Sequence, residues 1–385
     1  MSEGSAEAVP EAGAGMIAAA TAAATADVMA EVIDVLVPTC NRPAALAVTL
    51  TAVGAQTWPA LRIVVADQSD GAGADTCAEV QAVLRYLRAT GRNVEFFRRL
   101  PRRGMAEQRA FLLGQVRSPY CLFVDDDVIL APDLVARLHA AIRAEGCGFV
   151  GSALHGLSFV GQRRPLQEAI EFWEGPVTPE TVRPGSPAWT RHHLHSAANL
   201  FHVQAGLGAG HADASGQPAR PDRRYKVAWV GGCVLFDTAM LKAAGGFDFW
   251  HQLPAQHCGE DVLAQQRVMA RYGGCAILPS GAYHMELPTT VTARAIDAPY
   301  VLPLEVPVEV PVDAPPDVPL GVPPAVPSEA LNTAFADADN GIADEGALQS
   351  DVRTMSADTP APQLMYPSGH AGAESDRPAP RTDPE

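Results

Sequence analysis

Three consecutive carboxylates give this chain its most distinctive chemical feature: Asp125, Asp126 and Asp127. They follow the apolar run 120–124, which has the composition of a buried strand. At the carboxyl end of a strand in an α/β sheet, such side chains face the crevice where ligands bind. A cluster of hard oxygen ligands with open coordination positions suits Mg²⁺ or Mn²⁺ carrying a phosphorylated substrate. The alternative is an acidic turn ahead of a helix that starts near Pro132.

The segments before these carboxylates alternate between apolar runs and stretches with helical composition. The sequence predicts strands at 33–38, 61–66, 94–97 and 120–124, with helices at 44–55, 77–90 and 105–116 between them. This alternation is typical of a parallel sheet with right-handed crossovers. The strand ends should therefore bring their polar turns together at one edge of the sheet.

Several motifs, taken in their order along the chain, resemble inverting family 2 glycosyltransferases of the GT-A fold. The resemblance lies in Val-Pro-Thr-Cys-Asn-Arg at 37–42, Asp67, the aspartates at 125–127 and Gly-Glu-Asp at 259–261, together with the segments 230–237 and 243–248. It extends over residues 32–292. It implies an α/β nucleotide-diphospho-sugar transferase fold with a Rossmann-like, mostly parallel central sheet.

The resemblance also implies which residues bind a nucleotide-diphospho-sugar donor, expected to be a UDP-sugar. These residues are Pro38, Thr39, Asn41, Arg42, Asp67, Arg103, Asp125 and Asp126. Asp67 would accept hydrogen bonds from uracil or ribose, although it could instead cap the following helix, and Asp70 competes for the role. Arg42 could equally be a solvated loop charge. Arg103 and Arg109 lie in a segment that can meet phosphate at a helix N-terminus.

In the family pattern, Asp125 and Asp127 flank a divalent cation, Mn²⁺ or Mg²⁺, and His284 is a candidate third ligand. The ion would neutralise the diphosphate leaving group as a Lewis acid. A histidine in a surface turn is the alternative for His284.

Inverting transfer needs one base to take the proton from the acceptor hydroxyl. Glu260 and Asp261 open an expected helix at 261–271, and carboxylates in a first turn also interact favourably with the helix dipole. The resemblance makes Asp261 the base, with Glu260 as the other catalytic candidate. His257 and Cys258 could orient the base or the acceptor.

The two ends of the chain differ from the middle in composition. Of the net charge of −16, residues 1–31 carry −5, residues 291–385 carry −12 and the middle carries +1. The ends are poor in core-forming residues, and the second is rich in Val-Pro repeats that favour polyproline II. We therefore expect a disordered segment at 1–31, a catalytic domain at 32–292 and a disordered tail at 293–385. The domain would divide into a donor-binding half, 32–130, and an acceptor-side half, 131–292.

The sequence thus predicts inverting transfer of a sugar to a hydroxyl of an acceptor that is a glycan, a lipid-linked molecule or a small molecule. The alternatives are a nucleotidyltransferase of similar fold and a non-catalytic sugar-nucleotide-binding scaffold. A nucleotidyltransferase should carry a Gly-rich basic loop after the first strand, where this chain has Pro-Thr-Cys-Asn-Arg.

Neither a nucleic-acid partner nor a transmembrane segment is expected, and the Pro-rich tail is a candidate partner-binding segment. Seven cysteines without a CxxC pair indicate reduced thiols. They favour a cytoplasmic protein, free or peripheral at the inner face of the membrane.

Overall fold

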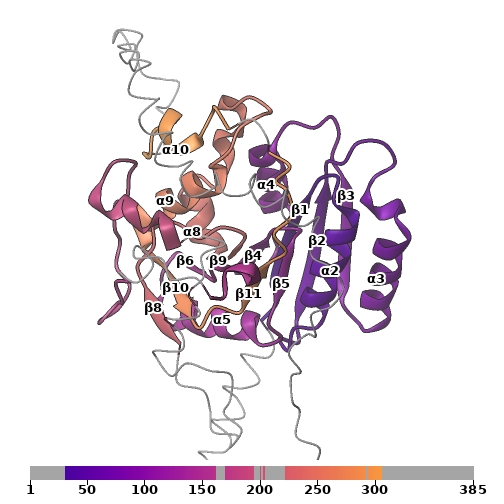
Figure 1. Cartoon of the computed structure of the whole chain (residues 1–385), viewed down its shortest axis with the longest axis horizontal. Helices are drawn as coiled ribbons and strands as arrows, with labels where there is room; N and C mark the ends of the chain where they lie inside the picture. Colours follow the sequence, from indigo (N-terminus) through magenta and orange to yellow (C-terminus); the bar gives the residue numbers. More distant parts are fainter. Residues whose placement is uncertain are drawn as a thin grey trace, which may run out of the picture. The chain divides into compact units, whose positions relative to one another are not determined.

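A parallel four-stranded unit forms the first half of an eight-stranded sheet (Figure 1). β1 (Ile33–Thr39) pairs in parallel with β2 (Leu61–Asp67) and with β4 (Tyr120–Val124), while β3 (Asn93–Arg98) pairs in parallel with β2. The helices between them are α2 (Pro43–Gly54), α3 (Ala78–Ala89) and α4 (Met105–Gly114). The predicted alternation of strands and helices is confirmed, and its segment boundaries agree with the structure to within about two residues.

The second half of the sheet mixes strand directions. The sheet order β3-β2-β1-β4-β9-β6-β10-β8 continues through β9 (Cys233–Asp237), β6 (Phe149–Gly151), β10 (Gly274–Leu278) and β8 (Arg223–Tyr225). β9 runs antiparallel to both of its neighbours, and β10 is parallel to β6 and antiparallel to β8. A separate three-stranded sheet joins β5 (Val128–Leu130), β11 (Ala282–His284) and β7 (Leu154–Gly156).

The remaining α-helices follow β5 along the chain. They are α5 (Leu134–Glu145), α8 (Thr238–Ala243), α9 (Glu260–Tyr272) and α10 (Ala298–Val301), with 3-10 turns η1 (Ala74–Thr76), η2 (Leu157–Phe159), η3 (Pro187–Leu194) and η4 (Asp248–Gln252). The structure is a computed structural model and describes residues 31–161, 170–194, 200, 203, 222–291 and 294–305. The disorder expected of the two ends therefore concerns residues that lie almost entirely outside the described ones.

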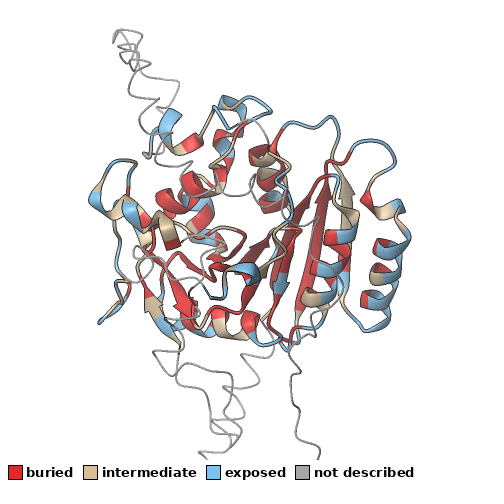
Figure 2. Ribbon diagram, viewed as in Figure 1, coloured by how far each residue is buried: buried red, intermediate tan, exposed pale blue. Residues whose placement is uncertain are grey.

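Alternate strand residues build two apolar layers, one on each face of the sheet. Val35 and Val37 of β1 belong to one apolar cluster together with side chains of α2, α3 and α5, whereas Leu36 between them belongs to a second cluster with side chains of α4, α8 and α9. Every residue of β1 and β2 is buried, as the red strands of Figure 2 show. Strands covered on both faces read as continuous apolar runs in the sequence. The expected Rossmann-like, mostly parallel α/β sheet is confirmed.

No helix of the described residues is long and apolar enough to cross a membrane. All seven cysteines fall within the described residues and are unpaired thiols, of which five are buried.

Helix α2 fixes the turn that carries the three aspartates. The hydroxyl of Thr49 donates to the carbonyl oxygen of Asp126 at 2.8 Å and accepts from the N–H of Val128 at 3.1 Å. Thr49 is fully buried, so these bonds satisfy backbone groups that water cannot reach. Strand β5 begins at Val128 immediately afterwards. One hydroxyl therefore ties the sheet-covering helix to the turn after β4.

Replacing this hydroxyl should destabilise the fold. We expect Thr49→Val, which keeps the shape but leaves two buried backbone groups unpaired, to lower the free energy of unfolding by about 1–3 kcal/mol. Thr51→Val is the matched control, because Thr51 is exposed on the same helix and bonds only within it, to the carbonyl oxygen of Ala47. Its effect should stay within about 0.5 kcal/mol. Urea unfolding of the full chain measures both, and equal effects would contradict the assigned role of Thr49.

Candidate active site

The ends of β1 and β4 bring the first polar pair of the site together. The parallel register of these strands places Thr39 beside the turn after β4, where its hydroxyl donates to Oδ2 of Asp126 at 2.6 Å. Asp126 is 7% exposed. Burial raises the pKa of Asp126 to about 7 despite the Thr39 hydrogen bond, and the neighbouring charge of Asp127 contributes in the same direction.

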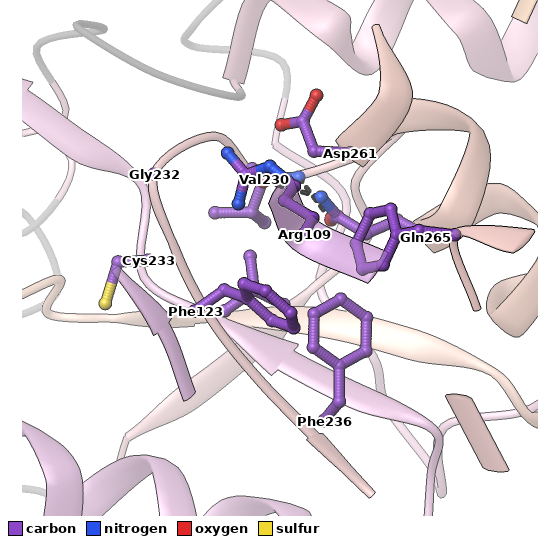
Figure 3. Close-up of a pocket in the computed structure, with 10 residues that line it drawn as sticks. Arg109, Phe123, Val230, Gly232, Cys233, Phe236, Asp261 and Gln265 are labelled. Atoms are coloured by element: carbon purple, nitrogen blue, oxygen red, sulfur yellow. Dashed lines mark hydrogen bonds between the residues drawn. The ribbon is translucent and has the colours of Figure 1, made fainter. Parts of the chain in front are cut away.

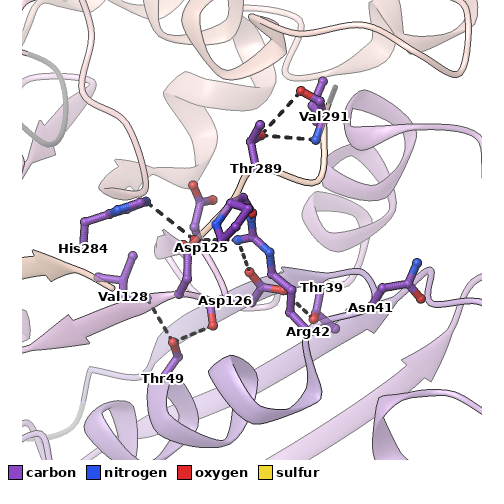
Figure 4. A network of polar contacts seen from close by, with 12 residues as sticks. Thr39, Asn41, Arg42, Thr49, Asp125, Asp126, Val128, His284, Thr289 and Val291 are labelled. Atoms are coloured by element: carbon purple, nitrogen blue, oxygen red, sulfur yellow. Dashed lines mark hydrogen bonds and ion pairs between the residues drawn. The ribbon is translucent and has the colours of Figure 1, made fainter. Parts of the chain in front are cut away.

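The positively charged side chain of Arg42 lies beside Asp126 and Asp127 (Figure 4). Its Nη1 lies 2.5 Å from Oδ2 of Asp127 and 3.4 Å from Oδ1 of Asp126, and its Nη2 donates to the carbonyl oxygen of Pro288. The Arg42 side chain is 15% exposed, so it is not the solvated loop charge of the alternative interpretation. On the other side of Asp127, Nε2 of His284 lies 3.5 Å from the same Oδ2. The structure thus gathers Thr39, Arg42, Asp126, Asp127 and His284.

A second network begins at the neighbouring carboxylate, Asp125. Arg109 of α4 donates from Nη2 to Oδ1 of Asp125 and from Nε to Oε1 of Glu260, both at 2.9 Å. The guanidinium is buried, and these carboxylates raise its pKa against the opposing effect of burial, so it stays charged. About a third of the Asp125 side chain remains exposed. Asp125 therefore belongs to both the aspartate cluster and the network that leads to α9.

Asp261 lies beside a small pocket at the start of α9 (Figure 3). The pocket is lined in addition by Arg109, Phe123, Val230 and Gln265, among others. Burial raises the pKa of Asp261 to about 7, Glu260 adds to this rise, and Arg109 opposes it. A carboxylate whose pKa lies near neutral pH is suited to accept a proton.

The side-chain amide of Gln265 fixes one wall of this pocket. Its Oε1 accepts from the N–H of Val230 and its Nε2 donates to the carbonyl oxygen of the same residue, both at 2.8 Å. All four atoms belong to buried residues, so this paired contact holds the segment ahead of β9 against α9.

Glu260 does not act as a helix cap. The residue at the N-cap is Gly259, with φ 72° and no side-chain hydrogen bond, and Glu260 instead makes its ion pair with Arg109. Sequence reasoning named Arg109 only as a phosphate candidate. It missed Thr49 and Gln265, which carry no local motif and act through partners far along the chain.

Asp67 is committed to protein groups. It is fully buried, and its oxygens accept from the N–H groups of Ser69 and Ala74, at 2.7 and 2.8 Å, and from Nη1 of Arg98 at 2.8 Å. Although burial acts in the opposite direction, these hydrogen bonds hold the pKa of Asp67 below its ordinary value. These bonds hold the loop after β2, whereas the following helix α3 has Cys77 at its N-cap and no side-chain cap from Asp67; a contact of Asp67 with the donor stays a prediction.

Three other residues predicted to bind the nucleotide-sugar donor belong neither to the network around Asp126 and Asp127 nor to the network around Asp125. Asn41 exchanges hydrogen bonds with Asp70, from Nδ2 to Oδ2 and from the Asp70 N–H to Oδ1, both at 2.9 Å. Pro38 is buried within β1. Arg103 is exposed, with its guanidinium 5.9 Å from the ring centre of Trp250.

The predicted metal ligands are partly assembled. Asp127 and His284 are neighbours, whereas Asp125 forms an ion pair with Arg109. Within the described ranges, no three His, Cys, Asp or Glu side chains form a cluster that could hold a metal ion. Two carboxylates and an imidazole are nonetheless donors that Mn²⁺ accepts. Their role as ligands stays a prediction.

Comparison with solved structures gives distant similarities. S. aureus TarS is 17% identical with a TM-score of 0.42, covering 66% of this chain and 36% of that one. Residues 1–349 of TarS, in complex with UDP-GlcNAc, are 15% identical with a TM-score of 0.44, and the match covers 68% of this chain and 60% of that one. The mannosyltransferase PcManGT from Pyrobaculum calidifontis, in complex with GDP-Man and Mn²⁺, is 16% identical with a TM-score of 0.38, and the match covers 64% of this chain and 56% of that one. The chain spans 36–60% of the length of these proteins, and TM-scores this low carry no argument about its chemistry.

Comparison with sequence families is more informative. No curated protein matches the chain. The model of the family described as glycosyl transferase family 2 matches residues 34–205, which contain every donor candidate from Pro38 to Asp127 and end before Glu260, Asp261 and His284. The match covers a little less than half of the chain and confirms, over residues 34–205, the resemblance to family 2 glycosyltransferases, while the mostly parallel α/β sheet confirms the fold class that the sequence predicted.

Proposed function

We propose that this glycosyltransferase moves a sugar from a UDP-sugar to an acceptor hydroxyl with inversion, assisted by a divalent cation. One observation carries the proposal: Arg109 joins Asp125 of the aspartate cluster directly to Glu260, next to Asp261. A single buried guanidinium thus sets a donor-binding cluster and a candidate base side by side. Inverting transfer requires this adjacency, because the base and the leaving group act on one reacting centre.

We assign binding of the nucleotide-sugar donor to the turn after β1 and the turn after β4. Thr39 and Arg42 already contact Asp126 and Asp127, so these residues form one polar surface at the carboxyl ends of parallel strands. Arg42 carries the fixed positive charge of that surface and is the side chain we assign to the diphosphate. The resulting domain assignment is donor binding by residues 32–130 and the acceptor side by residues 131–292.

Asp125, Asp127 and His284 are the residues that would hold the cation. When bound, the ion supplies Lewis-acid stabilisation of the departing diphosphate. Oδ2 of Asp127 is shared by Arg42 and His284, so a ligand role for this oxygen requires the Arg42 guanidinium to move away from it. This displacement would leave Arg42 free to pair with phosphate.

Asp261 is the residue we assign as the base. Its surroundings raise its pKa to about 7, so near neutral pH it alternates readily between accepting and releasing a proton. Glu260 is held by Arg109 and positions the turn. A nucleotidyltransferase would not need a general base beside the aspartate cluster. A non-catalytic scaffold protein would not need a carboxylate, such as that of Asp261, with a raised pKa.

Removing the charge of Asp127 should weaken metal-dependent nucleotide binding. In Asp127→Asn we expect the affinity for UDP with Mn²⁺ to fall by at least about 10–100-fold, because one anionic ligand is lost. Calorimetry with UDP and Mn²⁺ measures this. Asp133→Asn is the control, since Asp133 is mostly exposed and lies 4.0 Å from its closest cation, Arg137. Unchanged affinity in Asp127→Asn would remove the metal assignment.

Neutralising Asp261 should separate chemistry from binding. Asp261→Asn keeps size and shape but cannot accept the proton, so turnover should fall by about 10²–10⁴-fold with nearly unchanged UDP affinity. Glu260→Gln is the matched change at the adjacent position and should cost less. Slow hydrolysis of the UDP-sugar serves as the assay. If Glu260→Gln abolishes turnover while Asp261→Asn spares it, the two roles are reversed.

The dependence of turnover on pH should report the ionisation of the Asp261 carboxylate. Only the deprotonated base accepts a proton, so a pKa of about 7 predicts that turnover declines as the pH falls through that value. Donor hydrolysis at saturating Mn²⁺ and UDP-sugar, from about pH 5.5 to 8.5, shows this limb. The residual activity of Asp261→Asn should lack it. An identical limb in that variant would assign the titration to another group.

A further inference from the structure

The segment 294–305 returns to the turn that precedes α9. The N–H of Cys258 donates to the carbonyl oxygen of Ile296, and the N–H of Ala298 donates to the carbonyl oxygen of Cys258, both at 2.9 Å. These bonds form an isolated parallel bridge between Cys258 and Asp297. We call residues 296–299 the brace. Sequence analysis placed all of them in the tail beyond the catalytic domain, yet they bond to the turn that ends two residues before Asp261.

The contact between brace and turn is close and specific. A Cβ atom at Gly259 would lie 1.9 Å from Oδ1 of Asp297 and 2.8 Å from Cδ of Pro299, so only a glycine fits beneath the brace. Gly259 also has a φ of +72°, which side chains disfavour. Ala298 is fully buried against apolar residues that include Leu263 of α9. The close approach of the brace to the turn therefore requires a glycine at position 259.

The opposite side of the same turn is anchored to α4. Nδ1 of His257 donates to the carbonyl oxygen of Pro254 at 2.7 Å, and Nε2 accepts from the N–H of Ala106 at 3.1 Å. This pattern fixes the neutral tautomer of His257. Helix α4 also carries Arg109, the partner of Glu260. The turn 257–259 is thus held between α4 on one side and the brace on the other.

We propose that the brace is a positioning element for the base, because it sets the backbone of Cys258 and Gly259 so that Glu260 reaches Arg109 and Asp261 borders the pocket. This inference rests on the proposed function, in which Asp261 takes the proton. It assigns a role in catalysis to residues that lie outside the 34–205 segment matched by the family model. Displacing the brace should therefore impair the chemical step and leave donor binding intact.

Ala298→Glu in the full chain tests this, because it forces a charge into a fully buried position of the brace. Val301→Glu is the matched control, since Val301 lies one turn further along α10 and is 49% exposed. We expect kcat for UDP-sugar hydrolysis to fall by about 10²-fold in Ala298→Glu, as for other small misplacements of a catalytic group. The KM and the affinity for UDP with Mn²⁺ should stay within about twofold, and Val301→Glu should match the unaltered chain.

Hydrogen exchange at the N–H groups of Cys258 and Ala298 reports directly whether the brace has left the turn. Faster exchange at both with an unchanged kcat would overturn the proposal, as would parallel losses of kcat and UDP affinity in a variant that keeps its cooperative unfolding transition. If Ala298→Glu does not fold, Asp297→Gly loosens the brace without burying a charge and is judged by the same outcomes. Absence of turnover in the unaltered chain would instead count against the proposed function itself.

Discussion

The buried guanidinium of Arg109 is the interaction on which the site depends. It lies between Asp125, at the end of β4, and Glu260, at the start of α9, and contacts both at 2.9 Å. Removing one partner of a buried ion pair leaves the other charge uncompensated, typically at a cost of about 3–5 kcal/mol. The contact therefore constrains how β4, α4 and α9 meet. The polar edge of the sheet and the pocket beside Asp261 both follow from that arrangement.

Crowded negative charge is the second constraint. The five carboxylates Asp125, Asp126, Asp127, Glu260 and Asp261 outnumber the two guanidiniums, of Arg42 and Arg109, that lie among them. Burial and mutual repulsion consequently raise the pKa values of Asp126, Asp127 and Asp261. Such a site gains from additional positive charge, which a divalent cation would provide. The same crowding gives Asp261 the proton affinity that a base needs near neutral pH.

The residues of the candidate site come from two different parts of the chain. The segment matched by the family model supplies β1 to β4 and the aspartate cluster. The later chain supplies α9 with Glu260 and Asp261, His284 on β11, and the brace. Glu260 reaches the cluster through Arg109, and His284 lies beside Asp127, whereas the brace contacts the turn before α9 at Cys258.

The sequence by itself determined the strands and helices of the first half, the place of the aspartates after β4 and a helix start within one residue of Glu260. Local hydrophobic periodicity and turn residues encode these features within a few neighbouring positions. Tertiary structure alone decided that Asp67 organises its own loop, that Glu260 pairs with Arg109, and that residues 296–299 belong to the folded body. The physical reason is separation along the chain: Arg109 and Glu260 are 151 positions apart, and no local pattern reveals which buried charge will meet which.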